Sequence, residues 1–597
     1  MRFLIAVGLR RHGTLRTVSS PAGRGRLVAR WCLARHGARR SPDDSTIVQH
    51  ERPDGMAHPV PSTADQASMS LRALHALLSS ARWHVALGGI CLTLLGGCTT
   101  PPFEPGDHPP SHAFEQPERS PLARLAPGPD AAPRDSNLRL LITGQEAFAA
   151  RAALAELAEH TLDLQYHLVA QDDATTLLLQ RLLRAAQRGA RVRLLVDDIG
   201  TALPESDLAA LSLHANVQVR LFNPFRSRGE VSRLLELMGN PKRLNRRMHN
   251  KLWIGDNAAA VIGGRNLGAA YFDTSPHEGF SDLDLLVAGP VVREASISFD
   301  SYWNSRWAVP LGLVVALPAD PAQALHDLDA RATAYQTGEY VRLLRDIEFG
   351  RKLRYGPLPM TTTPAHILAD PPTPDADAID EAAGDPRTIF RALRAAVTTA
   401  QREVIMVTPY LVPSESGMGV LCSLAGRGVA VRVLTNSLAS TDVPAVHSAY
   451  ARYRPRLLAC GVQLFELRPA SAVDTATRRR LSSHGSLHAK AIVIDRHWLL
   501  MGSMNLDPRS RRLNTEVALQ TDSADIGGQL AALFDESVTL DQVWQVVLER
   551  PGDSKSAVAW NGLVDGQPSA EADEPGASAW RQWSATLLGW LIDEELL

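Results

Sequence analysis

Two short segments of the chain repeat one set of residues whose side chains can act on phosphate. Both read His-x-Lys-x-x-x-x-Asp, with His249, Lys251 and Asp256 in the first segment and His488, Lys490 and Asp495 in the second. In an extended strand, side chains two positions apart point to the same side, so each histidine shares a face with its lysine. An imidazole can attack phosphorus or donate a proton, and a lysine can hold anionic oxygens. Each pair could therefore address one phosphate group.

The repeat continues downstream in register. Gly263-Gly-Arg-Asn266 and Gly502-Ser-Met-Asn505 each begin seven residues after the motif aspartate. Because glycine lets the backbone approach a ligand closely, we expect Asn266 and Asn505 to contact the substrate. Only five of the 62 basic residues are lysines, and two of the five lie in these motifs, so chance is a poor explanation of the repeat.

The elements around the motifs also repeat. Strand, helix and strand are expected at 162–166, 175–187 and 192–196 in the first half and at 404–407, 419–425 and 431–434 in the second. This order indicates a sheet with βαβ connections. Each motif strand ends in a polar turn followed by an apolar strand, which predicts a hairpin. We expect Asp256 and Asp495 to brace these turns rather than to do chemistry.

The duplicated motif with its Gly-Gly or Gly-Ser and asparagine resembles the phospholipase D superfamily, over roughly residue 138 to the C-terminus. Four phrases are similar to the bacterial cardiolipin synthases of the C type: Arg247-Met-His-Asn-Lys251, Thr408-Pro-Tyr-Leu-Val-Pro413, Thr441-Asp-Val-Pro-Ala-Val-His447 and Gly502-Ser-Met-Asn-Leu-Asp-Pro508. The resemblance implies an α/β fold of two tandem phospholipase D-like domains. Each would be a mixed β-sheet flanked by helices on both faces, with the active site at the pseudo-twofold interface.

The resemblance also implies a mechanism. One histidine attacks phosphorus, the other protonates the departing alcohol, and a phosphohistidine intermediate passes the phosphatidyl group onward. The family order makes His249 the nucleophile and His488 the acid, although the motifs by themselves are symmetric. The motif lysines and the two asparagines would hold the non-bridging oxygens. No cofactor and no metal are implied.

Each histidine needs a partner that fixes its ring orientation, usually a carboxylate. Asp282 and Glu516 follow the two asparagines at comparable distances, each at the start of an apolar strand, and the family places an orienting acid there. Asp284 is an alternative to Asp282. Ordinary carboxylates at strand ends are the alternative to an orienting role for both.

The implied reaction forms cardiolipin from phosphatidylglycerol and a second phospholipid. The resemblance implies phosphatidylethanolamine as the donor, and a second molecule of phosphatidylglycerol is the alternative donor. Hydrolysis of phospholipids to phosphatidic acid and a nuclease on the same scaffold are the alternatives. The near balance of 62 basic and 64 acidic residues gives no overall pull toward nucleic acid, so no nucleic-acid partner is expected. The need for a protein partner stays open.

The N-terminal region resembles a targeting segment. Residues 69–98 have arginines, an apolar run and Leu95-Gly-Gly-Cys98, which resembles a lipoprotein signal peptide, so Cys98 would be lipidated and hold the protein on the periplasmic side of a bacterial envelope. Residues 1–68 fit a wrongly assigned extension or a disordered tail. A Pro-rich linker at 99–137, domains at 138–354 and 384–597, and an inter-domain linker at 355–383 complete the expected organisation.

Three further features allow two interpretations each. Cys422 and Cys460 are expected as buried free thiols rather than a bridge. Basic residues before the motifs, at 242–247 and 478–480, fit either lipid headgroups or a solvated loop. The apolar stripe formed by Trp580, Trp583, Leu587, Trp590 and Leu591 is expected to dock on the second domain rather than on a membrane.

Overall fold

The computed structural model describes residues 109–199, 205–274, 279–336, 338, 341, 348–372, 389–469, 485–564 and 566–594. The expected signal segment with Cys98 and the arginines at 478–480 lie outside these residues.

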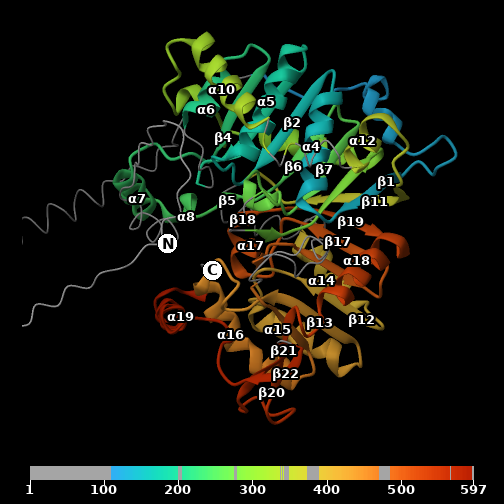
Figure 1. Ribbon diagram of the computed structural model, residues 1–597, viewed down its shortest axis with the longest axis vertical. Helices are drawn as coiled ribbons and strands as arrows, with labels where there is room; N and C mark the ends of the chain where they lie inside the picture. Colours follow the sequence, from blue (N-terminus) through green and yellow to red (C-terminus); the bar gives the residue numbers. More distant parts are fainter. Residues whose placement is uncertain are drawn as a thin grey trace, which may run out of the picture. The chain divides into compact units, whose positions relative to one another are not determined.

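The first half is built on a mixed sheet (Figure 1). Its strands are β1 (Asp135–Leu141), β2 (Thr161–Tyr166), β3 (Arg191–Asp197), β4 (Val217–Phe222), β6 (Leu252–Gly255), β7 (Ala259–Gly263), β9 (Asp284–Ala288) and β10 (Ala308–Pro310). Their pairing gives the order β10-β4-β3-β2-β6-β7-β9-β1, in which β2, β3 and β4 are parallel. The expected βαβ connection and the motif hairpin β6–β7 are confirmed.

The second half repeats this order. Its strands are β11 (Thr361–Ala369), β12 (Glu403–Val407), β13 (Ala430–Asn436), β14 (Gln463–Leu467), β16 (Ala491–Ile494), β17 (Trp498–Gly502), β19 (Val517–Asp522), β20 (Val543–Leu548), β21 (Val558–Val564) and β22 (Gln567–Glu571). They run β11-β19-β17-β16-β12-β13-β14-β20-β21-β22. Because β1 pairs with β11, the two sheets join edge to edge.

The first strand of the second repeat, β11, lies within the segment expected as an inter-domain linker, 355–383. β11 takes the position in the second sheet that β1 takes in the first. Its Pro- and Thr-rich sequence suggested a linker, but Ala365 is buried, residues 361–364 pair with β1 and residues 365–369 pair with β19. A strand that contacts the sheet of each half fixes the junction between them.

Helices cover both faces of the sheet, as expected for the α/β class. Outer helices are α4 (Gly144–Leu157), α5 (Asp173–Gln187), α6 (Glu205–Ser212), α10 (Pro321–Tyr335) and α12 (Glu348–Tyr355) on the first half, and α14 (Ile389–Thr398), α15 (Ser414–Gly426) and α16 (Pro444–Ala459) on the second. On the inner side, α9 (Pro290–Trp303) and α18 (Ala524–Ser537) share one apolar core with strands of both halves. This central core holds the two repeats against each other.

Two short parallel sheets connect the halves next to the motifs. β5 (Arg247–Met248) pairs with β18 (Asn514–Thr515), and β8 (Phe280–Ser281) pairs with β15 (Ser486–Leu487). The remaining helical elements are α7 (Glu230–Gly239), α8 (Pro241–Leu244), α17 (Pro508–Arg512), α19 (Ala579–Leu591), η1 (Pro117–Arg119), η2 (Pro121–Leu125), η3 (Ala269–Tyr271) and η4 (Leu311–Leu313).

The described part of the expected Pro-rich linker at 99–137 is not a free spacer. Residues 117–125 form η1 and η2, and Leu122 and Leu125 are buried in the core of the first half. The Ser120 hydroxyl donates to Asp256, which ties the segment to the first hairpin turn. The proline-rich composition of this segment did not indicate that two of its leucines pack against the domain.

Cys422 and Cys460 form a disulfide, so the expectation of two free thiols is wrong. Cys422 lies on α15 and Cys460 directly follows α16. Packing of these two helices brings the Cα atoms within 5.3 Å, which is a spacing that a disulfide requires. The cysteines are 38 positions apart in sequence, so sequence alone did not indicate this proximity.

The C-terminal helix α19 packs on α16, but its tryptophans do not. Ala585 is buried, whereas Trp580 and Trp590 are 71% and 86% exposed. The expected docking on the second domain therefore holds for the helix and is wrong for the tryptophan stripe, because the small side of the helix faces the protein. Within the described ranges, no helix has the length and apolar character needed to cross a bilayer.

Candidate active site

The short inter-half sheets place each motif histidine beside an acid of the other half. In β5–β18, Met248 is opposite Thr515, so the next residues, His249 and Glu516, are neighbours. The same register in β8–β15 places Ser281 opposite Leu487. Asp282 and His488 follow these residues in sequence. The backbone pairing thus builds two crossed histidine–carboxylate pairs.

The distances agree with hydrogen bonds in both pairs. Nδ1 of His249 lies 2.8 Å from a carboxylate oxygen of Glu516, and Nδ1 of His488 lies 2.5 Å from Oδ2 of Asp282. Asp284, the alternative acid, instead pairs with Arg151 at 2.9 Å inside the first half. The expected acids, Asp282 and Glu516, are therefore the ones that contact the motif histidines. The sequence did not reveal that each acid serves the histidine of the other half.

Gly264 and Ser503 occupy matching motif positions, and each contacts the acid of its own half in a different way. A Cβ added at Gly264 would collide with the carboxylate of Asp282, so glycine is required for the close approach. In the second half, the Ser503 hydroxyl donates to Glu516, and Ser510 donates to it at 2.8 Å. The second residue of the Gly-Gly and Gly-Ser motifs therefore makes room for, or donates a hydrogen bond to, the acid beside a motif histidine.

Both motif lysines are buried beside their histidines. Lys251 Nζ donates to the His249 carbonyl at 2.5 Å, and Lys490 Nζ donates to the His488 carbonyl. Lys490 Nζ also lies 2.9 Å from Nδ1 of His488. The strand geometry therefore places each lysine on the face of its histidine.

The motif aspartates lie at the other end of the motif strands, outside this cluster. The carboxylate of Asp256 accepts from the backbone N–H groups of residues 159–161, and that of Asp495 accepts from those of residues 401–403. Each aspartate also sits in the left-handed region, with φ of 49° and 51°. These contacts brace the turns and leave neither carboxylate directed at the histidines. The contacts of Asp256 and Asp495 thus agree with the bracing role expected from the sequence rather than with a catalytic one.

The two motif asparagines differ. Asn266 donates to the Tyr271 hydroxyl at 3.0 Å and accepts from the Leu168 N–H, so its amide is engaged within the first half. Among the described residues, the buried Oδ1 of Asn505 has no hydrogen-bond partner. Asn505 is thus the better placed of the two to contact a ligand.

His167 is a neighbour that the sequence pattern did not single out. Its ring centroid lies 5.0 Å from that of His249, and its Nδ1 lies 3.0 Å from the Met248 carbonyl. It directly follows β2, and the carboxyl ends of parallel strands are where α/β sheets place ligand groups. That position was the available signal. The described ranges contain no cluster of His, Cys, Asp and Glu that could hold a metal ion.

Arg247, one of the basic residues considered for headgroup contact, has another role. It is fully buried and pairs with Asp197 at 2.8 Å beneath the first motif. Arg243 is partly buried and pairs with Glu236 at 3.1 Å. Lys242 is exposed in the same segment. Only part of this basic segment is available to a ligand.

Comparison with known proteins identifies the family. The family "Cardiolipin synthase, PLD-like domain" matches residues 153–303 and 393–538, one segment for each motif. Cardiolipin synthase C of Escherichia coli (strain K12) is 36% identical over 459 residues, which cover 76% of this chain and 94% of that protein. The chain belongs to the phospholipase D superfamily.

Two further similar proteins are more distant. Cardiolipin synthase of Geobacillus kaustophilus (strain HTA426) is 28% identical over 408 residues, 67% of this chain and 66% of that protein. A crystal structure of phosphatidylserine synthase from Haemophilus influenzae Rd KW20 has a TM-score of 0.44 at 14% identity and covers 71% of this chain and 89% of that one. As a member of the phospholipase D superfamily of the cardiolipin synthase type, the chain is an enzyme of the phosphatidyltransferase class.

Burial controls the charge of both histidines in this phospholipase D-type site. Burial lowers the pKa of His488 to about 4, and the hydrogen-bonded Asp282 opposes that shift. Burial also lowers the pKa of His249 well below its usual value, and the charges of Lys251 and Lys490 add to the effect. Burial therefore favours the neutral form of both rings in the free protein.

The pKa values of the two acids shift in opposite directions. Burial raises the pKa of Glu516 to about 7, against the opposing charge of Lys251. Burial would also raise the pKa of Asp282, but His488 and Lys490 outweigh it and lower that pKa below the usual value. Asp282 is therefore ionised at neutral pH, while Glu516 titrates there.

Proposed function

We propose that this protein forms cardiolipin from phosphatidylglycerol and a second phospholipid through a phosphohistidine intermediate. The observation that carries the proposal is the pair of crossed contacts, His249–Glu516 and His488–Asp282, at one site between the halves. Similarity to cardiolipin synthase C supports the choice of product. Two buried neutral imidazoles with fixed rings suit a reaction that needs one nucleophile and one proton carrier.

In the first proposed step, Nε2 of His249 attacks phosphorus of the donor lipid. A P–N bond forms, the P–O bond to the headgroup breaks, and His488 gives its proton to the leaving alkoxide. In the second step, His488 takes the proton from the acceptor hydroxyl, the acceptor oxygen attacks phosphorus, and the P–N bond breaks. The proton lost by His488 in the first step returns in the second, so the enzyme is regenerated.

Electrostatics support this assignment of roles. An ionised carboxylate stabilises an imidazolium, and the ionised acid belongs to His488. A phosphodiester bound beside His488 adds a second negative charge and raises its pKa further, so that it can serve as a proton donor. His249 lacks such support and stays neutral, as a nucleophile must.

The buried lysines would stabilise charge on the phosphoryl oxygens. Lys251 and Lys490 are each fully enclosed, and a charge in such an environment interacts more strongly than in water. Asn505, with its unpartnered Oδ1, would position an incoming hydroxyl or a headgroup donor. Because the site is enclosed, water has limited access to the intermediate, which favours transfer over hydrolysis.

The direct experiment supplies purified enzyme with mixed vesicles of phosphatidylglycerol and phosphatidylethanolamine. We expect cardiolipin with release of ethanolamine or, if a second phosphatidylglycerol is the donor, glycerol. Mass analysis of lipids and free headgroups distinguishes these donors. Phosphatidic acid as the main product at high phosphatidylglycerol would establish a hydrolase instead. Nucleotide release from DNA without lipid turnover would establish a nuclease.

The proposal includes attachment through a lipid on Cys98 at the periplasmic side of the envelope. The apolar run before Leu95-Gly-Gly-Cys98 motivates it, and the Cys422–Cys460 disulfide supports an oxidising compartment. Anchoring would confine enzyme and acceptor lipid to one surface and so raise their effective concentration. Cys98→Ser should block processing and membrane retention, and unchanged mature mass with full retention would contradict the anchor.

A further inference from the structure

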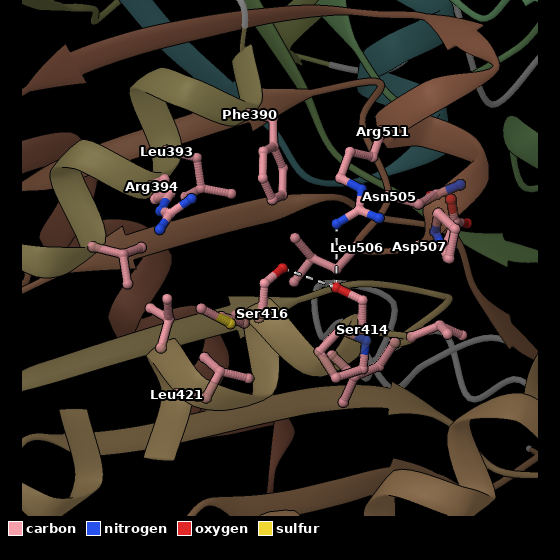
Figure 2. Close-up of a pocket in the computed structure, with 18 residues that line it drawn as sticks. Phe390, Leu393, Arg394, Ser414, Ser416, Leu421, Asn505, Leu506, Asp507 and Arg511 are labelled. Carbon is pink, nitrogen blue, oxygen red and sulfur yellow. Dashed lines mark hydrogen bonds between the residues drawn. The ribbon is translucent and has the colours of Figure 1, made fainter. Parts of the chain in front are cut away.

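An apolar groove lies between α14 and α15 in the second half (Figure 2). It is an open cavity with a volume of about 90 Å³. Its walls are formed mainly by Phe390, Leu393, Val397, Leu411, Val420 and Leu421. In Figure 2, Phe390 and Leu393 approach it from α14, and Leu421 approaches it from α15. An open cavity with such walls favours a hydrocarbon ligand.

One end of the groove is lined by a residue of the second motif segment. Asn505 and Asp507 form one end of it, and Asn505 is the motif asparagine whose buried Oδ1 has no partner among the described residues. Leu506 lines the groove and also a small cavity beside Lys490. A molecule in the groove would therefore have one end close to the second motif.

Among the described residues, the charged side chains that line the groove are Arg394, Asp507 and Arg511. Arg394 is exposed on α14, and Arg511 reaches over the groove, where it donates to the Ser414 hydroxyl at 3.2 Å and lies 5.7 Å from the Phe390 ring. An apolar channel with cations at its opening matches an anionic headgroup attached to a hydrocarbon tail. A polar headgroup alone would leave these walls without a partner.

We propose that this groove binds an acyl chain of the phospholipid whose phosphate occupies the site. The inference rests on the proposed function, because it identifies the tail of that same substrate. A chain in the groove would extend from phosphorus at the motifs past Asn505 and along α14 and α15. Binding of the chain would then help to position the phosphate, since binding energy remote from the reacting bond can be used for orientation.

The test uses matched variants of the full chain on one helix. Val420→Trp fills the groove, and Ser423→Trp places the same side chain on the exposed side of α15. Gly417→Leu and Gly419→Leu form a second pair. A Cβ at Gly417 meets the Pro413 Cβ at 3.3 Å inside the groove, whereas one at Gly419 meets no atom within 4 Å. Thermal melts confirm that each variant folds.

The first measurement is kcat/KM for monomeric phosphatidylglycerols with acyl chains from butanoyl to octanoyl. In the unmodified protein we expect kcat/KM to rise about fourfold for each methylene that enters the groove. Val420→Trp and Gly417→Leu should flatten this dependence, and the two controls should keep it. An unchanged dependence in both groove variants, or none in the unmodified protein, would overturn the proposal.

The second measurement does not require turnover. A phosphatidylglycerol with a diazirine at the end of its acyl chain is photolysed with the folded His249→Asn protein, and labelled peptides are identified by mass spectrometry. We expect labels on α14 and α15, reduced at least about tenfold in Val420→Trp with respect to Ser423→Trp, which is the affinity lost with a few buried methylenes. Labels confined to α7 or α19 would overturn the groove. Absence of lipid turnover with labelling of α14 and α15 would overturn the catalytic proposal alone.

Discussion

The pocket of His249 and that of His488 are built from equivalent strands, yet the surroundings of the carboxylate and of the motif asparagine differ between them. The carboxylate beside His249 accepts hydrogen bonds from two serines, and burial raises its pKa to about 7. The carboxylate beside His488 packs closely against Gly264, and its pKa is lowered below the usual value by His488 and Lys490. Asn266 is engaged by its own half, whereas Asn505 faces a groove. The two halves thus share one scaffold, and the differences between their pockets are what the proposed division of chemical roles rests on.

Asparagine at the two histidines tests this division with the largest expected effect. His249→Asn removes the nucleophile and should lower kcat by at least about 10⁴-fold with any leaving group. His488→Asn removes only proton transfer, so the loss should be about 10² to 10⁴-fold with a natural headgroup and much smaller with a nitrophenol leaving group. Steady-state rates with both donor types measure this. Equal losses with both leaving groups in the two variants would contradict the division of roles.

Replacing each of the two acids by its amide should lower kcat by different factors, and both losses should be smaller than the loss in His249→Asn. Asp282→Asn removes the charge that supports the His488 imidazolium and should lower kcat by about 10³-fold. Glu516→Gln keeps an acceptor for Nδ1–H of His249, so we expect a loss of only about tenfold at the pH optimum. The measurement is kcat for the two variants at several pH values. A larger loss in Glu516→Gln than in Asp282→Asn would reverse the comparison.

The pH dependence should reflect both halves. Below about pH 7, protonated Glu516 would donate to Nδ1 of His249 and leave the proton on Nε2, so kcat/KM should rise as pH increases through that pKa. Burial lowers the pKa of Lys490 to about 8, so kcat/KM should fall as pH increases further and the lysine loses its charge. Glu516→Gln should remove the acid limb.

The basic limb has its own matched pair. Lys490→Arg should remove the fall above about pH 8, since arginine stays protonated, and Lys251→Arg should keep it. The profiles of kcat/KM for the two variants, measured with one soluble phospholipid, give the comparison. A fall above pH 8 that persists in Lys490→Arg would assign that limb to another group.

The disulfide concerns the second half alone and should have the smallest effect on catalysis. Cys460→Ser removes the link between α15 and α16 and should lower the free energy of unfolding by about 3 kcal/mol. We expect kcat to change less than twofold because both cysteines lie outside the histidine cluster. Denaturant unfolding in the presence and absence of a reductant measures the effect. Equal stability of the reduced and oxidised protein would contradict a stabilising role.

The sequence was informative where local pattern determines structure. The hairpins that carry His249 and His488 and the strand–helix–strand units follow from spacing and periodicity. The acids at 282 and 516 were expected from their spacing together with the resemblance to the family. The crossed pairing does not follow from spacing, because it depends on β5–β18 and β8–β15, which are two-residue contacts between distant segments. The disulfide and the strand β11 were missed for the same reason.

Composition misled at β11. Its threonines and Pro364 resemble a linker, and only the presence of a sheet edge on either side makes the segment a strand. The groove between α14 and α15 likewise depends on tertiary packing, since its apolar residues read in sequence as ordinary helix cores. Local rules therefore predicted the elements and the motif residues, and the contacts between halves required the structure.

The identity of the histidine that bears the phosphatidyl group tests the central claim most directly. The His488→Asn protein is mixed with radiolabelled phosphatidyl-nitrophenol, quenched in base, digested, and the labelled peptide is sequenced by mass spectrometry. A phosphatidyl group on His249 is the predicted result, with no label in the His249→Asn protein. A label on His488 in the unmodified protein, or one that survives in His249→Asn, would contradict the assignment of nucleophile and acid to the two halves.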